Sequence, residues 1–95
     1  MPRRNGRKGP SKKRMTFRIA APEAARVNLV GSFNGWDPGA RVMRKDGKGI
    51  WKTTMMLEPG TYEFRFLVDG EWQNDGESMR ITNPFGTENC MRIVG

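Results

Sequence analysis

Two tryptophans lie beside sequence turns rather than within alternating strand patterns. Trp36 follows an Asn-Gly turn in the segment GSFNGWDP (31–38), and Trp72 comes soon after an Asp-Gly turn at 69–70. Such turns display the next side chains at the surface, and large indoles exposed there are typical of a contact surface for an apolar, planar ligand. The alternative is that each indole folds back as a lid over a small core.

Three polar residues accompany the two indoles and narrow the class of ligand. Arg65 is on the outward face of a predicted strand, and Thr87 and Asn89 are in a late loop. A sugar ring has an apolar face of axial C–H groups that stacks on an indole, and its rim of hydroxyls needs hydrogen-bond donors and acceptors. Each polar side chain taken alone suits a solvated surface position. Together with the indoles they favour a sugar-binding surface.

The residue types of the chain disfavour catalysis. There is no histidine, so the nucleophile candidates Ser32, Ser78 and Cys90 lack their usual activating base. Hydrolysis of a glycoside needs two carboxylates across a cleft, whereas the ten Asp and Glu residues here lie mostly at turns. The lack of histidine and the single cysteine also remove the usual Cys/His metal sites. We therefore expect no catalytic residue, no metal site and no cofactor.

The same composition leads to a prediction about the cellular compartment. A single cysteine cannot form an internal disulfide, which disfavours an oxidising compartment. No apolar segment reaches the roughly 18 residues of a membrane-spanning helix, and none follows the N-terminal charges as in a secretory signal. We expect a cytoplasmic protein with no membrane association.

Charge divides the 95 residues into a tail and one small domain. The formal charge is +7, and residues 1–14 contain seven Lys or Arg and no acid, together with Gly and Pro. Such a segment is typical of disorder. We predict a disordered basic tail over 1–14 and a folded domain over 15–95. Nucleic-acid binding would depend on the tail alone, which has no aromatic side chain to stack on bases.

Hydrophobic residues in the folded part alternate with a period of two, which predicts short antiparallel strands. Tyr62, Phe64, Phe66 and Val68 share one face of the clearest strand. A similar alternation places Trp51 in the core. The remaining predicted strands cover 15–20, the region of Val27 and Leu29, 51–57, 79–82 and 90–94. About seven such strands suit an all-β, immunoglobulin-like β-sandwich without its disulfide.

Three segments in this order resemble a known family. VNLVGSFNGWDP (27–38), YEFRFLVDGEW (62–72) and FGTEN (85–89) are similar to carbohydrate-binding module family 48, which includes the glycogen-binding domain of the AMP-activated protein kinase β subunit and the N-terminal early-set domain of isoamylases. The resemblance spans about 17–94. It implies an early-set, immunoglobulin-like sandwich, in agreement with the fold class expected from the alternation.

The resemblance also implies a function and a set of site residues. Members of the kinase type bind α-1,4-linked glucans such as glycogen without catalysis, and their stacking tryptophans match Trp36 and Trp72. A loop residue that grips the glucan matches Phe85, where leucine is common in the family. The basic strand residue, usually lysine, matches Arg65. The remaining polar contacts match Thr87 and Asn89.

A second interpretation keeps the fold and changes the function. Many early-set domains attached to enzymes serve as packing modules, so this chain could instead be an interaction module. Its partner would then be a family 13 glycoside hydrolase or a kinase-like protein. The complete set of matched contacts favours glucan binding.

Overall fold

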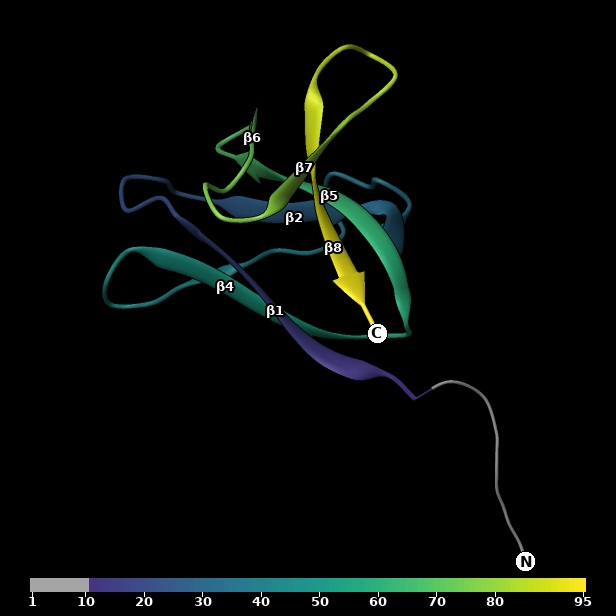
Figure 1. Ribbon diagram of the computed structural model, residues 1–95. Helices are drawn as coiled ribbons and strands as arrows, with labels where there is room; N and C mark the ends of the chain where they lie inside the picture. Colours follow the sequence, from purple (N-terminus) through teal and green to yellow (C-terminus); the bar gives the residue numbers. More distant parts are fainter. Residues whose placement is uncertain (1–10) are drawn as a thin grey trace, which may run out of the picture.

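The computed structural model describes residues 11–95, which form two antiparallel β-sheets packed against each other (Figure 1). One sheet has the strand order β1-β4-β3 and is called the β1 sheet below. The other, the β5 sheet, has the order β2-β5-β8-β7, and β6 also pairs with β5. The strands are β1 (Lys13–Ala20), β2 (Val27–Gly31), β3 (Arg44–Lys45), β4 (Ile50–Leu57), β5 (Gly60–Val68), β6 (Glu71–Gln73), β7 (Met79–Thr82) and β8 (Glu88–Val94).

The nine-residue strand β5 organises the larger sheet. Its second half pairs with β2 along one edge, and the opposite edge pairs with β8 and then with β6. Because side chains alternate across a strand, Phe64 and Phe66 face the core while Glu63 and Arg65 face outward. β5 therefore carries core packing on one face and polar groups on the other, as its alternation predicts.

Aromatic side chains from both sheets meet in the core. Phe17 of β1 and Phe64 of β5 have ring centroids 4.9 Å apart in an edge-to-face arrangement, and Phe64 meets Phe66 in the same way at 5.7 Å. All three rings are fully buried. Trp51 of β4 is also buried, and its indole N–H donates to the carbonyl of Ala21 at 2.9 Å. The predicted core position of Trp51 is confirmed.

The all-β sandwich predicted from the sequence is confirmed, with differences at its short strands. β3 and β6 add to the predicted strands. β1 begins at Lys13, and its register pairs Lys13 with Leu57 and Arg14 with Met56. The last two residues of the predicted tail are thus held in a strand by cross-strand pairing. Residues 11 and 12 precede the strand without regular secondary structure, and residues 1–10 lie outside the described residues.

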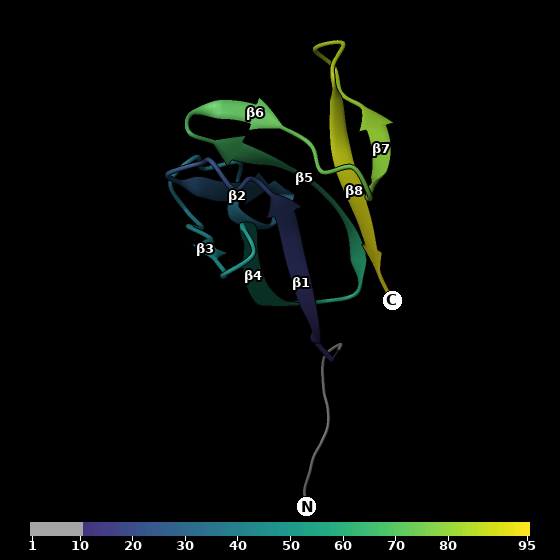
Figure 2. The same ribbon diagram turned by 90° about the vertical axis from the view of Figure 1, so that its left-hand side faces the viewer.

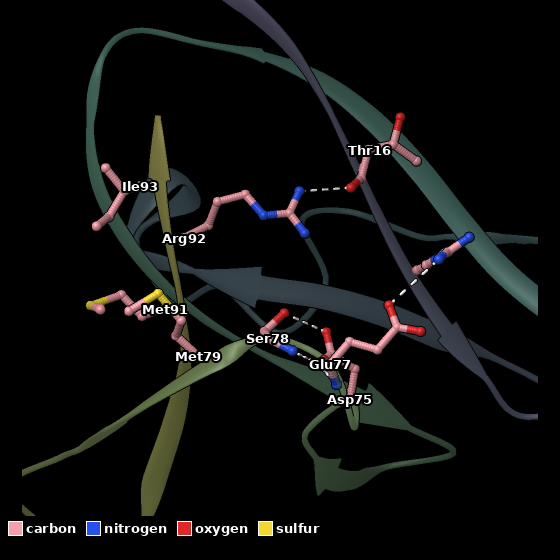
Figure 3. Close-up of a pocket in the computed structure, with 9 residues that line it drawn as sticks. Thr16, Asp75, Glu77, Ser78, Met79, Met91, Arg92 and Ile93 are labelled. Carbon is pink, nitrogen blue, oxygen red and sulfur yellow. Dashed lines mark hydrogen bonds and ion pairs between the residues drawn. The ribbon is translucent and has the colours of Figure 1, made fainter. Parts of the chain in front are cut away.

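One side of the sandwich is closed by an arginine rather than by a strand. Arg92 of β8 extends toward β1, where its guanidinium donates to the carbonyl of Thr16 at 2.8 Å (Figure 3). The guanidinium carbon lies 4.5 Å from the centre of the Phe17 ring, a cation–π contact that also covers the apolar core. Arg92 therefore links β8 of the β5 sheet to β1 of the other sheet. Figure 2 shows these two strands from a second direction.

Two further observations concern residues 11–95. No helix in this range is long and apolar enough to cross a membrane. Across the same residues, no three His, Cys, Asp or Glu side chains are grouped so that they could hold a metal ion.

The single cysteine gives a direct test of core packing. Cys90 is fully buried, and burial raises the pKa of its thiol. Because the thiolate is the reactive form, we expect Cys90 to resist Ellman's reagent in the folded protein and to react once denaturant unfolds the chain. Absorbance of the released thiol anion follows the reaction. Native protein that reacts as fast as denatured protein would contradict this packing.

Candidate functional site

The outer face of the β5 sheet carries a pocket of about 410 Å³. All six residues predicted as a binding site line it, although they are distributed over 54 positions of the chain, from 36 to 89. Three further residues complete the lining. The predicted residues are Trp36, Arg65, Trp72, Phe85, Thr87 and Asn89, and the additional ones are Glu63, Asn83 and Pro84.

The two indoles come from different elements and are both accessible. Trp72 lies on β6, paired with Leu67 of β5, and 45% of its surface is exposed. Trp36 follows the short 3-10 helix η2 (Ser32–Asn34) and is 38% exposed. Neither indole belongs to the core cluster. They line the pocket instead of serving as lids over the core.

The backbone of Trp36 adopts a left-handed conformation, with φ at 60°. A bulky residue with positive φ is uncommon and strained, and such strain tends to occur at functional sites. The N–H of Trp36 donates to the carbonyl of Gly31 at 2.9 Å. Asn34 supports the same turn, because its side chain accepts from the N–H of Gly31 and donates to the carbonyl of Leu29, both at 3.1 Å. These bonds hold the indole at the rim of the pocket.

Hydrogen bonds orient the polar groups of the pocket. The Nε of Arg65 donates to the side-chain oxygen of Asn74 at 3.0 Å, and the amide of Asn74 donates to the carbonyl of Glu88 at 2.9 Å. The amide of Asn89 donates to the carboxylate of Glu63 at 3.0 Å. Arg65 still has guanidinium N–H groups free of these bonds. The polar lining of the pocket thus combines a charged donor, Arg65, and a charged acceptor, Glu63, with the amide of Asn89, and these bonds orient all three.

The loop between β7 and β8 extends beyond the body of the sandwich (Figure 1). Asn83 holds it together, because its side-chain oxygen accepts from the N–H groups of Phe85 and Thr87 at 3.0 and 3.1 Å. Its amide donates to Thr87 Oγ1 at 2.8 Å and to Asn89 Oδ1 at 3.0 Å. Phe85 is 89% exposed in this loop. A largely exposed phenyl ring on a loop that is held by these bonds suits a contact surface for a ligand.

The sequence contained partial signals for the residues that the prediction missed. Glu63 shares the outward face with Arg65, and Asn83 begins an Asn-Pro pair in a predicted loop, but neither position carried a motif. Asn74 had no local signal, because its role depends on its contact with Arg65. The pocket therefore offers aromatic faces for stacking and fixed polar groups for hydroxyls, the two features that a sugar ring requires.

This combination of a small β-sandwich and an open, aromatic and polar pocket defines the protein as a carbohydrate-binding module. Residues 15–94 match the sequence model of the glycogen recognition site of AMP-activated protein kinase. The chain belongs to that family. The resemblance seen in the three sequence segments is confirmed.

Several curated proteins are similar to this chain. Protein FLOURY ENDOSPERM 6, chloroplastic, from Oryza sativa subsp. japonica is 37% identical over 87 residues, which cover 92% of this chain and 16% of that protein. Protein PTST homolog 2, chloroplastic, from Arabidopsis thaliana is 39% identical over 71 residues, covering 75% and 13%. The 1,4-alpha-glucan branching enzyme GlgB from Aquifex aeolicus (strain VF5) is 40% identical over 68 residues, covering 66% and 11%.

These relatives contradict the predicted cytoplasmic location, because two of the three are named as chloroplastic. The prediction depended on the lone cysteine and on the absence of a secretory signal. Both disfavour oxidising compartments, but neither distinguishes one reducing compartment from another. The chain also spans only 16% and 13% of the first two relatives. The match therefore describes a domain and not the whole length of those proteins.

Proposed function

We propose that this chain binds α-1,4-linked glucans such as glycogen through the pocket on the outer face of the β5 sheet, and that it does so without catalysis. The observation that carries the proposal is the lining of that pocket, where Trp36 and Trp72 are exposed beside Arg65 and Asn89. Sugar rings stack on the indoles, and their hydroxyls bond to the polar side chains. Family membership over residues 15–94 supports the same ligand class.

The geometry of the pocket favours weak, reversible binding. Covering about 100 Å² of each indole contributes roughly 2–3 kcal/mol at about 25 cal/mol per Å². Part of this gain offsets the loss of translational and rotational freedom on association. We therefore expect a dissociation constant between about 10 μM and 1 mM. A single module of this affinity exchanges readily between glucan chains.

The pocket lacks what glycoside hydrolysis needs. Glu63 is the one acid that lines it, whereas a glycosidase needs a pair of carboxylates flanking the scissile bond. The carboxylate of Glu63 is also bonded to Asn89. The binding function therefore stands without an enzymatic step in this domain. An interaction module that packs against a glucan-active enzyme without holding sugar is the competing proposal for the same fold.

Titration of the purified chain with maltoheptaose and with β-cyclodextrin tests the proposal. Isothermal titration calorimetry should show saturable binding to both ligands, and the chain should be retained on glycogen. Parallel incubations with maltoheptaose, amylose and glycogen should release no reducing sugar above a buffer control. Absence of binding to all three glucans would favour the interaction module. Turnover abolished by replacing one Asp or Glu would refute the non-catalytic assignment.

A further inference from the structure

Charge is distributed unequally between the two sheets. The strands of the β1 sheet contain six Lys or Arg and no Asp or Glu, whereas the strands of the β5 sheet contain three of each. The six cations are Lys13, Arg14, Arg18, Arg44, Lys45 and Lys52; the β5 sheet has Arg65, Arg80 and Arg92 with Glu63, Glu71 and Glu88. The charges of the sandwich are therefore polarised. The basic sheet lies opposite the pocket lined by Trp36 and Trp72, which is called the sugar pocket below.

Strand register places three of these cations in one row. Lys52 of β4 pairs with Arg18 of β1 on one side and with Arg44 of β3 on the other. Residues paired across antiparallel strands point to the same face of the sheet and lie about 5 Å apart. All three are exposed. Like charges directly opposite one another destabilise a sheet, so this row has a cost in the isolated domain.

Two carboxylates of the chain itself already contact this row. Asp46 lies 3.3 Å from the ammonium of Lys52, and Glu77 lies 3.5 Å from the guanidinium of Arg18. The N–H groups of Lys48 and Ile50 donate to Asp46 at 2.7 and 3.1 Å. The row therefore accommodates carboxylates at its cationic groups. Within residues 11–95, Arg44 has no ion-pair partner.

A hollow of about 600 Å³ lies next to the row. It forms where the two-residue strand β3 ends, because β3 pairs with only part of β4. Four of its lining residues are cationic and one is acidic. The lining consists of Arg41, Val42, Arg44, Lys45, Asp46, Lys52, Thr53 and Thr54. An anionic chain that crosses the row would therefore meet further cations and two hydroxyl groups in this hollow.

We propose that the exposed face of the β1 sheet around Arg18, Arg44 and Lys52, called the basic face, is a docking surface for an acidic polypeptide segment. In an extended peptide, alternate side chains lie about 7 Å apart on one side, a spacing that long Arg and Lys side chains can match. Guanidinium groups bind carboxylates through paired hydrogen bonds. The partner would contribute a carboxylate to Arg44, which has no ion-pair partner within residues 11–95, and further carboxylates along the row.

Other polyanions fit this surface less well. The residues that face outward on its strands include no aromatic ring that could stack on bases. Insertion into a lipid surface needs apolar side chains beside the cations. The exposed apolar side chain Met56 pairs with Arg14, four residue pairs further along the strands than the pair of Arg18 and Lys52. Val42 is a single exposed apolar side chain in the lining of the hollow. Nucleic acid is therefore an outcome that the test must separate.

Fluorescence anisotropy with a labelled poly-glutamate peptide tests the proposal on the full chain. Combining Arg18→Gln, Lys52→Gln and Arg44→Gln should weaken binding about tenfold at low salt, because each exposed ion pair contributes only modestly. Removing the repulsion should leave Tm unchanged or raise it.

Arg26→Gln removes one exposed cation outside the basic face and should change the affinity less than twofold. Arg44→Glu alone should weaken peptide binding about fivefold. This single variant tests the proposal if the triple variant does not fold.

Three results would overturn the proposal. The first is unchanged peptide affinity in the triple variant together with loss of affinity when Arg3, Arg4, Arg7 and Lys8 are replaced by glutamine. The second is tighter binding of an oligouridylate of equal charge than of the peptide. The third is absence of peptide binding to the unaltered chain. Saturating maltoheptaose should leave peptide binding unchanged, so failure of the sugar proposal would be seen separately.

Discussion

Replacing Trp36 or Trp72 with alanine is expected to weaken glycogen binding about thirtyfold in each case. Both indoles line the sugar pocket and are 38% and 45% exposed. If each covers about 100 Å² of apolar sugar surface, its loss costs roughly 2 kcal/mol, which corresponds to about thirtyfold in affinity. Native affinity electrophoresis in gels containing glycogen measures the change. Circular dichroism melts of the same variants report whether the fold is retained.

A matched control for the tryptophan variants is available on the same sheet. Ile93 is 62% exposed on β8 and does not line the sugar pocket, so Ile93→Ala should migrate like the unaltered protein. Trp36→Gly provides a second control, because glycine adopts the positive φ of this position without strain. It should lose glycogen retention as Trp36→Ala does. Unchanged mobility of both tryptophan-to-alanine variants would remove the proposed site.

Gly31→Ala is expected to destabilise the domain by about 3 kcal/mol. A Cβ at this position would lie 2.6 Å from the carbonyl oxygen of Glu63 and 2.8 Å from the Cβ of Phe64, both on the neighbouring strand β5. Relief of such overpacking requires the strands to separate. In a domain of this size the loss lowers Tm by roughly 10–20 °C. Chemical denaturation and thermal melts both measure the effect.

Gly47→Ala is the matched control for this substitution. No atom lies within 4 Å of its added Cβ and its φ is not in the positive region, so its Tm should stay close to that of the unaltered protein. A Gly31→Ala variant that melts with the control would contradict the close packing of β2 on β5. Displacement of Glu63 should also disturb Asn89, to which its carboxylate is bonded. Folded Gly31→Ala is therefore expected to bind glycogen more weakly.

The two proposed surfaces lie on opposite faces of the sandwich. The sugar pocket is on the outer face of the β5 sheet, and the basic face is on the outer face of the β1 sheet. A chain with both functions would hold a glucan and an acidic protein at the same time. The domain would then bring its partner to the glucan.

The sequence alone determined the fold class and indicated six of the nine residues that line the proposed sugar pocket. Side chains alternate along a strand, so the run from Tyr62 to Val68 specifies both a strand and its buried face. Turn residues are likewise local signals, and they marked Trp36 and Trp72 as surface residues. Phe85 was identified through the family segment FGTEN. These features depend on neighbouring residues or on the order of three short segments that resemble a known family.

The tertiary structure alone decided which distant residues support these groups. Asn74 orients Arg65 and Asn83 holds the loop of Phe85 through contacts that no local pattern encodes. Trp36 has positive φ because the turn around it is fixed by bonds back to β2. The row of Arg18, Lys52 and Arg44 depends on the register of three strands that are separate in sequence. Register results from the packing of the whole core, so the three cations of the basic face come together only in the folded chain.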